Sequence, residues 1–397
     1  MKSKDVLRIL LIVGTRPEAV KLLPLWMILV GDKRFDVHLV TTGQQTELVK
    51  HVFGPFHVHP DIELCLMDPT QTLNDLTSRA INALADVYKK MCPEVVVIQG
   101  DTTSAFCAAL AAFQHTPRIN VAHVEAGLRT YDRLSPYPEE ANRKMIAALA
   151  DYHFPPTTKD AKHLYREGIE RDQVVVTGNT VIDALQLVID QKDTSKEFDL
   201  PSDRHSVLIT LHRRESWAFE DKQANRTVME GMLAALHNVA TCFKDIQFIF
   251  RKHPNPKVYE PAMRELGHVQ NIRFIEPIPS YLTFVKLLSR MRLIVTDSGG
   301  IQEEAPALGV PVLVLREKTE RIDALFMEGC QIVGTSEKEI QARLMETLTK
   351  LQRIPPAPIC PMKLCLTPIG DGKSAERIRD SLLHFMRGDQ SRSLKKA

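Results

Sequence analysis

The stretch Val95-Val-Val-Ile-Gln-Gly-Asp101 shows the pattern that decides the fold, a short and continuous apolar run that ends in a polar turn. A strand that is buried on both faces is apolar at every position, whereas a strand with one face in water alternates. Helical stretches separate this run from others like it, and such alternation predicts parallel βαβ units. The runs occupy residues 7–13, 37–41, 95–98, 119–122, 174–177, 206–210, 247–250, 272–275, 293–296 and 310–315.

The runs form two groups, one in each half of the chain, and a length of 397 residues also favours two domains. We therefore predict an α/β protein with two Rossmann-like, doubly wound parallel sheets. The polar, aperiodic stretch 191–204 is the predicted boundary. Ligands of open α/β sheets bind beyond the carboxyl ends of the strands, so we expect the two domains to face each other across a cleft. We expect domains over residues 1–190 and 205–372, a helix over 373–387 and a flexible tail over 388–397.

The composition and charge argue against several classes of protein. A net charge of +2, with lysine and arginine spread along the chain, argues against a nucleic-acid-binding protein. The seven cysteines include no C-x-x-C pair, which argues against a zinc site or a disulfide framework and favours a reducing cytoplasm. No segment approaches the roughly 20 consecutive apolar residues of a membrane span. We expect a cytoplasmic protein without nucleic-acid or membrane partners.

Three carboxylates, those of Asp101, Glu125 and Glu139, lie at or just beyond the ends of predicted strands. Such a cluster suits proton transfer, provided that the surroundings separate the pKa values of its members. Carboxylates at strand ends also cap helices or pair with arginines. The spacing by itself leaves both interpretations open.

Two glycine-containing turns follow predicted strands and begin predicted helices, namely Gly14-Thr-Arg-Pro-Glu18 and Asp297-Ser-Gly-Gly-Ile-Gln-Glu-Glu304. In the first turn, an arginine can contact a phosphate. In the second, backbone N–H groups at a helix N-terminus suit a phosphate, and Glu304 could accept both hydroxyls of a ribose. For the first turn, the alternative is an ordinary joint between a strand and a helix. For the second turn, the alternative is helix capping by Asp297 or Ser298.

Histidine and basic residues follow two further predicted strands, in His212-Arg-Arg-Glu215 and Lys252-His-Pro254. Paired cations at strand ends suit a diphosphate, and a solvated charge cluster is the alternative. The motif Gly370-x-Gly-x-x-Ala375 formally fits a relaxed dinucleotide fingerprint. Pro368 precedes it and no βαβ unit surrounds it, so we interpret it as the start of the last helix. We expect neither NAD nor a metal ion.

These motifs occur in the order found in the bacterial non-hydrolysing UDP-N-acetylglucosamine 2-epimerases, which the chain resembles from about residue 9 to 325 and again over 370–377. The resemblance implies a glycosyltransferase-B-like fold, a homodimer, UDP in the cleft and a last helix that crosses back to the first domain. It rests on the motifs above and on Gly100-Asp-Thr-Thr103, His123-Val-Glu-Ala-Gly-Leu-Arg-Thr130, Pro138-Glu-Glu-Ala-Asn-Arg143 and Thr177-Gly-Asn-Thr180.

The resemblance also implies a role for each site residue. The family's catalytic residues correspond to Asp101, Glu125, Glu139 and His212. Its nucleotide contacts correspond to Arg16, Lys21, Arg143, Ser298, Gly299, Gly300 and Glu304, and we also expect Arg213, Phe284 and Arg321 to bind the substrate. The implied substrates are UDP-N-acetylglucosamine and UDP-N-acetylmannosamine.

The implied reaction inverts C2 of the nucleotide sugar through anti elimination of UDP, a bound 2-acetamidoglucal and re-addition of UDP. It supplies activated N-acetylmannosamine for surface polysaccharide and needs no cofactor. The residues leave three alternatives open. These are a UDP-sugar-dependent glycosyltransferase of the same architecture, a hydrolysing 2-epimerase that releases free N-acetylmannosamine and UDP, and a catalytically inactive nucleotide-sugar sensor.

Overall fold

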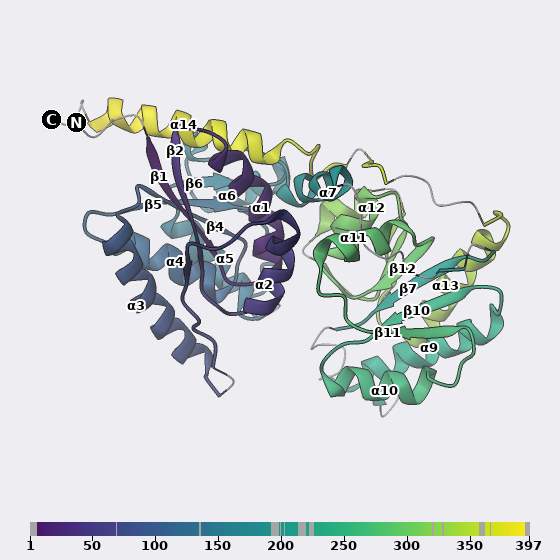
Figure 1. Cartoon of the computed structure of the whole chain (residues 1–397). Helices are drawn as coiled ribbons and strands as arrows, with labels where there is room; N and C mark the ends of the chain where they lie inside the picture. The colour runs from purple at the N-terminus through teal and green to yellow at the C-terminus, as the bar shows by residue number, and fades with distance from the viewer. Residues whose placement is uncertain are drawn as a thin grey trace. The chain divides into compact units, whose positions relative to one another are not determined.

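The computed structural model contains two compact units (Figure 1). Unit 1 comprises Met1–Asp190 together with Ile369–Ala397, and unit 2 comprises Gln191–Pro368. The end of the chain therefore belongs with its beginning, four residues earlier than the predicted domain limit at 372. The structure describes residues 6–393 except 69, 135, 192–197, 199, 202, 213–219, 222–225, 320, 328, 357–361 and 366.

The sheet of unit 1 has six strands, all parallel, in the order β3-β2-β1-β4-β5-β6. Every residue of β4 is buried, which explains why its sequence is continuously apolar. The strands are β1 (Leu7–Val13), β2 (Phe35–Thr41), β3 (Ile62–Glu63), β4 (Val95–Gln99), β5 (Asn120–Val124) and β6 (Tyr152–Phe154).

Helices pack on this sheet in two groups. Helices α3, α4 and α5 share a hydrophobic cluster with alternate residues of the strands, such as Leu10 and Ile12. Helices α1, α7 and α14 contact one another, and α14 runs along unit 1 in Figure 1. The helices are α1 (Arg16–Val30), α2 (Thr46–Phe53), α3 (Leu73–Met91), α4 (Thr103–Phe113), α5 (Glu139–Leu149), α6 (Thr158–Arg166), α7 (Thr180–Asp190) and α14 (Ser374–Ser393), with short 3-10 turns η1 (Gly54–Phe56) and η2 (Arg171–Gln173).

The sheet of unit 2 repeats this design, with six parallel strands in the order β11-β10-β7-β12-β13-β14. The strands are β7 (Ser206–Thr210), β10 (Gln247–Arg251), β11 (Ile272–Ile275), β12 (Leu293–Thr296), β13 (Val312–Val314) and β14 (Cys330–Ile332). A separate antiparallel pair joins β8 (Glu220–Asp221) to β9 (Arg226–Thr227).

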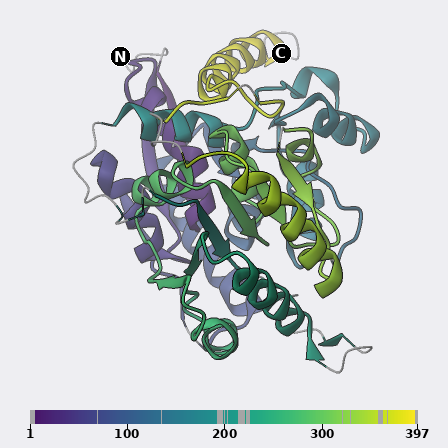
Figure 2. The same ribbon diagram turned by 90° about the vertical axis from the view of Figure 1, so that its right-hand side faces the viewer.

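Alternate residues of β7 pack into different hydrophobic clusters, so both faces of the second sheet are covered. Val207 and Ile209 pack with α9, α10 and α13, whereas Leu208 packs with α11 and α12. Helices α9 and α13 lie side by side in both views of the ribbon (Figures 1 and 2). The helices are α9 (Val228–Cys242), α10 (Pro256–Leu266), α11 (Tyr281–Ser289), α12 (Ile301–Ala307) and α13 (Glu337–Gln352), with the 3-10 turn η3 (Ile322–Phe326).

The predicted α/β class with two Rossmann-like parallel sheets is confirmed, because both sheets have the strand order 3-2-1-4-5-6 that is typical of this fold. The predicted strand over 174–177 is wrong, since only an isolated bridge joins Val174 to His153. The short strands β3, β6 and β14 were not predicted. Helix α14 continues to Ser393, so residues 388–393 are helical in place of the expected tail. Among the described residues, no helix is long and apolar enough to cross a membrane.

Candidate active site

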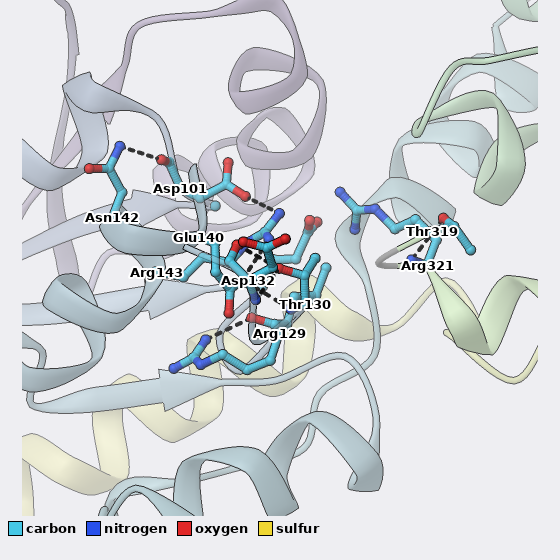
Figure 3. Close-up of polar contacts among 12 residues, drawn as sticks. Asp101, Arg129, Thr130, Asp132, Glu140, Asn142, Arg143, Thr319 and Arg321 are labelled. Atoms are coloured by element: carbon cyan, nitrogen blue, oxygen red, sulfur yellow. Dashed lines mark hydrogen bonds and ion pairs between the residues drawn. The ribbon is translucent and has the colours of Figure 1, made fainter. Parts of the chain in front are cut away.

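Asp101 lies in the turn between β4 and α4, at the carboxyl edge of the first sheet. Gly100 makes this turn with a φ of +71°, a backbone conformation that favours glycine. Arg143 of α5 forms an ion pair with the Asp101 carboxylate at 2.5 Å, and Asn142 donates to its main-chain oxygen at 2.9 Å (Figure 3). Pairing with an arginine, one of the two interpretations left open above, is therefore found at Asp101.

Arg143 also contacts Glu140, whose side chain is completely buried. The Nη1 atom of Arg143 lies 3.0 Å from Oε2 of Glu140. The same carboxylate accepts hydrogen bonds from the backbone N–H groups of Thr130 and Tyr131, each at 3.0 Å. A buried charge with this many partners is satisfied where it stands. Glu140 therefore anchors the loop after β5 to α5, and Arg143 links this anchor to Asp101.

Glu125 follows β5, the strand next to β4, and has a φ of +63°. A left-handed conformation is uncommon for a residue other than glycine and concentrates at functional sites. Its side chain is 5% exposed, and it forms a buried ion pair with Lys21 of α1. Asn179 donates to the same carboxylate oxygen, Oε2, at 3.2 Å. Two elements that are distant in sequence therefore hold one oxygen of Glu125.

The remaining predicted residues of unit 1 lie at the starts of helices. Glu139 is the first residue of α5 and is partly exposed. Arg16 is the first residue of α1, and its backbone N–H donates to Oε1 of Gln45 at 2.9 Å. Parallel strands β4 and β5 end at the same edge of the sheet, and α5 reaches Asp101 through Arg143. The three predicted acids therefore belong to loops and a helix start around one sheet edge.

Glu18 is a buried member of this edge to which the sequence assigned no role. Its carboxylate accepts the backbone N–H groups of Gly14 at 3.0 Å and Thr15 at 2.6 Å, and the hydroxyl group of Thr102 at 2.8 Å. Burial raises its pKa to about 7, although the hydrogen bonds from Thr102 and Thr15 oppose the rise. The available signal was the capping-box spacing of Thr15 and Glu18. Glu18 joins the loop after β1 to the loop that carries Asp101.

His123 supports the same loop from β5. Its Nε2 atom lies 2.7 Å from the main-chain oxygen of Gly100. Burial lowers the pKa of His123 to about 3, so the imidazole is neutral at neutral pH. A carbonyl oxygen only accepts hydrogen bonds, so the proton lies on Nε2. The sequence showed this histidine only as part of the motif that contains Glu125.

In unit 2, His212 follows β7 and Asp297 follows the neighbouring strand β12. The Asp297 side chain is fully buried, and its Oδ1 atom lies 2.7 Å from Nδ1 of His212. The backbone N–H of His212 also donates to both carboxylate oxygens at 3.1 Å. Because an ionised carboxylate only accepts, Nδ1 carries a proton and Nε2 is left as the outer nitrogen of the ring. Asp297 therefore orients His212. The N-cap residue of α12 is Gly300, and not Asp297 or Ser298.

The predicted phosphate loop lies between β12 and α12. Ser298 and Gly299 are partly exposed and Gly300 is exposed, so their backbone can be approached from solvent. The Ser298 N–H donates to Oγ1 of Thr296 at 3.0 Å, and Gln302 donates to the Ser298 carbonyl at 3.0 Å. These two bonds fix the backbone of Ser298 on both sides.

The other predicted residues of unit 2 lie in more buried positions. Glu304 is 8% exposed, and Phe284 belongs to the hydrophobic cluster between the second sheet and α11 and α12. Arg321 pairs with Glu303 at 3.0 Å, and its backbone N–H donates to Thr319 (Figure 3). Arg213 lies outside the described residues. In the part of the chain that the structure describes, no three His, Cys, Asp or Glu side chains are grouped as a metal site.

A family model described as UDP-N-acetylglucosamine 2-epimerase matches residues 28–383. The chain belongs to this family. It is 41% identical to the UDP-N-acetylglucosamine 2-epimerase of Salmonella typhimurium, over 96% of this chain and 99% of that protein. It is 37% identical to the Bacillus subtilis enzyme of the same name, over 95% of each chain. The family resemblance predicted from the motifs is confirmed.

Solved structures of the family have the same fold. The UDP-GlcNAc 2-epimerase of Neisseria meningitidis, bound to UDP-GlcNAc, superposes with a TM-score of 0.86 at 35% identity, over 95% of this chain and 100% of that one. The Methanocaldococcus jannaschii enzyme, in complex with UDP-GlcNAc and UDP, has a TM-score of 0.79 at 31% identity, with the same coverage. The glycotransferase of kitacinnamycin, at 12% identity and a TM-score of 0.56, shares the fold alone. The predicted glycosyltransferase-B-like architecture of the two domains is confirmed.

Proposed function

We propose that the protein interconverts UDP-N-acetylglucosamine and UDP-N-acetylmannosamine without net hydrolysis. The observation that carries this proposal is the pair of neighbouring strand-end acids, Asp101 and Glu125, each held by its own cation at one sheet edge. Membership of the family and the UDP-GlcNAc bound to the Neisseria meningitidis enzyme support the choice of substrate.

The chemistry follows from the poor acidity of the C2 proton, which lies beside an acetamido group. When the bond from C1 to the diphosphate oxygen breaks, its electron pair leaves with UDP, and the positive charge at C1 acidifies the C2 proton. A base removes that proton to give 2-acetamidoglucal. An acid then protonates C2 from the other face, and a diphosphate oxygen of UDP adds back to C1. The two halves balance without oxidation or reduction.

The acids of unit 1 suit the two proton transfers. Lys21 and Asn179 both donate to Glu125, and such donors favour the ionised form that a general base needs. Asp101 pairs with Arg143 but is 22% exposed, so it can exchange a proton more readily than a sealed group. Glu139 is the third candidate. Two of these acids serve opposite faces of C2.

The residues of unit 2 suit the departing nucleotide. The hydroxyl group of Ser298 and the backbone N–H groups of Gly299 and Gly300 precede a helix and match a diphosphate. Asp297 orients His212, so that Nε2, when the ring carries a second proton, can donate to the developing negative charge on UDP. Glu304 is assigned to the ribose hydroxyls. Arg16, Lys21, Arg143, Arg213, Phe284 and Arg321 keep their predicted substrate-binding roles as part of the same proposal.

The test is NMR of UDP-N-acetylglucosamine incubated with the purified protein in D2O. We expect UDP-N-acetylmannosamine to form with deuterium at C2, until both sugars reach equilibrium. Accumulation of free N-acetylmannosamine and UDP would indicate a hydrolysing epimerase. An unchanged substrate would indicate a glycosyltransferase or a sensor. An epimer that retains its original C2 proton would contradict the acid–base mechanism.

We further infer that the product supplies surface-polysaccharide synthesis and that the protein works in the cytoplasm as a homodimer. The family resemblance supports each of these points. Sedimentation of the purified chain tests the homodimer, and a monomer at all concentrations would contradict it. Loss of N-acetylmannosamine from surface polysaccharide after gene deletion tests the pathway.

A further inference from the structure

The chain after the second sheet returns to unit 1 and interlocks with the turn that precedes α7. The backbone N–H of Asn179 donates to the carbonyl of Ile369 at 2.6 Å. Arg377 of α14 donates to the carbonyl of Thr177 at 3.0 Å. We call residues 369–377 the return segment, and residues 177–180 the turn that it holds.

The two segments approach too closely to admit larger residues. Gly178 has a φ of +88°, and a Cβ atom added to it would lie 2.6 Å from Oγ of Ser374. A Cβ atom at Gly370 would lie 3.2 Å from the carbonyl oxygen of Asn179. Asp183 of α7 also accepts the backbone N–H of Ala375 at 2.8 Å. Backbone therefore packs against backbone here, and the turn has little freedom to shift.

Asn179 connects this interlock to the proposed active site. It is 2% exposed, and its Oδ1 atom accepts the N–H of Val181 at 3.0 Å, as an N-cap residue does. Its Nδ2 atom donates to Oε2 of Glu125 at 3.2 Å. A single buried residue thus joins the two, since its backbone N–H bonds the return segment and its side chain bonds Glu125.

We propose that Asn179 is a positioning residue for Glu125, and that the return segment holds Asn179 in the place from which it acts. The inference deepens the proposed epimerase function and rests on it. Lys21 from α1 and Asn179 from the turn before α7 donate to the same oxygen of Glu125, so together they restrict rotation of the carboxylate. The end of the chain thereby contributes to catalysis without touching substrate.

The first test is Asn179→Asp, which keeps the shape of the side chain and its helix-capping oxygen. The variant replaces the Nδ2 donor by a carboxylate oxygen and sets a like charge beside Glu125. We expect kcat to fall roughly ten- to a hundredfold, the typical effect of losing a hydrogen bond to a charged group, with a smaller change in KM. The acid limb of the kcat profile should move upward by about one pH unit or more, because a like charge raises the pKa of Glu125.

The ionisable groups known to interact with Glu125 do not obscure this readout. Lys21 forms the same buried ion pair with Glu125 in both proteins. His123 interacts electrostatically with Glu125, but burial lowers its pKa to about 3, so it is neutral there. Each is present in the wild-type protein and in the variant.

The second test weakens the return segment without touching Glu125. Arg377→Met removes the bond to Thr177 and the ion pair with Asp371, and we expect a severalfold loss of kcat with an unchanged acid limb. Arg379→Met is the matched control, because Arg379 lies on the same helix but pairs with its neighbour Asp380. Its kcat should equal that of the wild-type protein.

The outcomes separate the positioning role from the proposed function. If wild-type protein does not epimerise UDP-N-acetylglucosamine, the proposed function fails. If it does, and Asn179→Asp retains the wild-type kcat and acid limb, the positioning role is overturned. A fall in kcat that matches a fall in thermal stability, with the acid limb in place, also overturns it, since a merely structural role predicts that result.

Discussion

The two sheets have the same strand order, yet their carboxyl edges carry different chemistry. In unit 1 the edge holds carboxylates paired with cations, as in Glu125 with Lys21 and Asp101 with Arg143. In unit 2 the edge holds two features. One is the loop after β12, with its hydrogen-bond donors, and the other is His212, which Asp297 orients. The shared topology decides where ligand-contacting residues lie, whereas the loop sequences decide what those residues do.

The two edges also differ in how deeply their functional groups are buried. Glu18, Glu125 and Glu140 are buried carboxylates, and each must recover its lost hydration through ion pairs and hydrogen bonds. At the second edge the buried carboxylate of Asp297 is satisfied by His212, whereas Gly299 is partly exposed and Gly300 is exposed. Substitutions of the acids at the first edge should therefore affect turnover and folding, and those at Glu304 and in the loop at Ser298 should affect mainly nucleotide affinity.

The largest expected effect is at Glu125. Glu125→Gln should lower turnover at saturating substrate by about 10²–10⁴-fold, because it removes a positioned proton acceptor. UDP affinity, measured by calorimetry, should change little. Asp101→Asn and Glu139→Gln should behave in the same way, and Glu63→Gln, an exposed acid on β3, is the matched control. A variant that turns over normally at saturation but binds UDP weakly would place its residue with the nucleotide.

Next in size is a pH effect on stability at Glu18. Its pKa is about 7 in the folded protein, above its ordinary value of 4.5, so the folded state holds the proton more tightly. Its contribution to the free energy of unfolding is complete below pH 4.5 and is lost as the pH rises to about 7. Between these pH values, the wild-type protein should lose up to about 3 kcal/mol relative to Glu18→Gln.

Denaturant unfolding of both proteins at several pH values measures this difference, and groups common to the two cancel. Glu18→Gln is a suitable reference, because the N–H groups of Gly14 and Thr15 bond a single oxygen of Glu18, which the amide oxygen can replace, and the amide does not titrate. A stability difference that does not vary between pH 4.5 and 7 would show that Glu18 is ionised throughout.

The smallest expected effect is at the second edge. Glu304→Ala should weaken UDP binding roughly tenfold, the usual cost of a lost hydrogen bond to a charged group, while turnover at saturation stays near the wild-type value. A 2′,3′-dideoxy analogue of UDP should bind the variant and the wild-type protein equally. If UDP and the analogue lose equal affinity, Glu304 does not contact the ribose. If turnover at saturation fell together with UDP affinity, the two edges would not differ in the way proposed.

Much of the fold was predictable because its signals are local. The run 95–98 predicts a strand because every position must be apolar when both faces are buried. The same signal failed at 174–177, which pairs only through an isolated bridge. The apolar signal was too weak for β3, β6 and β14, because each has only two or three residues. These segments are strands because a neighbouring strand pairs with them.

The candidate site was predictable in part. Turn motifs indicated Asp101, Glu125 and the loop at Ser298, since glycines and acids at strand ends stand out in a sequence. They did not distinguish Glu139 from Glu140, of which the second is the buried anchor of the loop after β5. They also gave no role to Glu18 or Asn179, whose functions depend on partners.

The sequence by itself determined most of the strands, their alternation with helices, the two-sheet class and the family, because periodicity and motifs are properties of adjacent residues. Only the tertiary structure decided the partners. His212 is 85 positions from Asp297, Lys21 is 104 from Glu125, and Asn179 is 54 from Glu125. No local pattern encodes such pairs, because strand order and the return of the last helix bring them together, and the burial they share gives the contacts their strength.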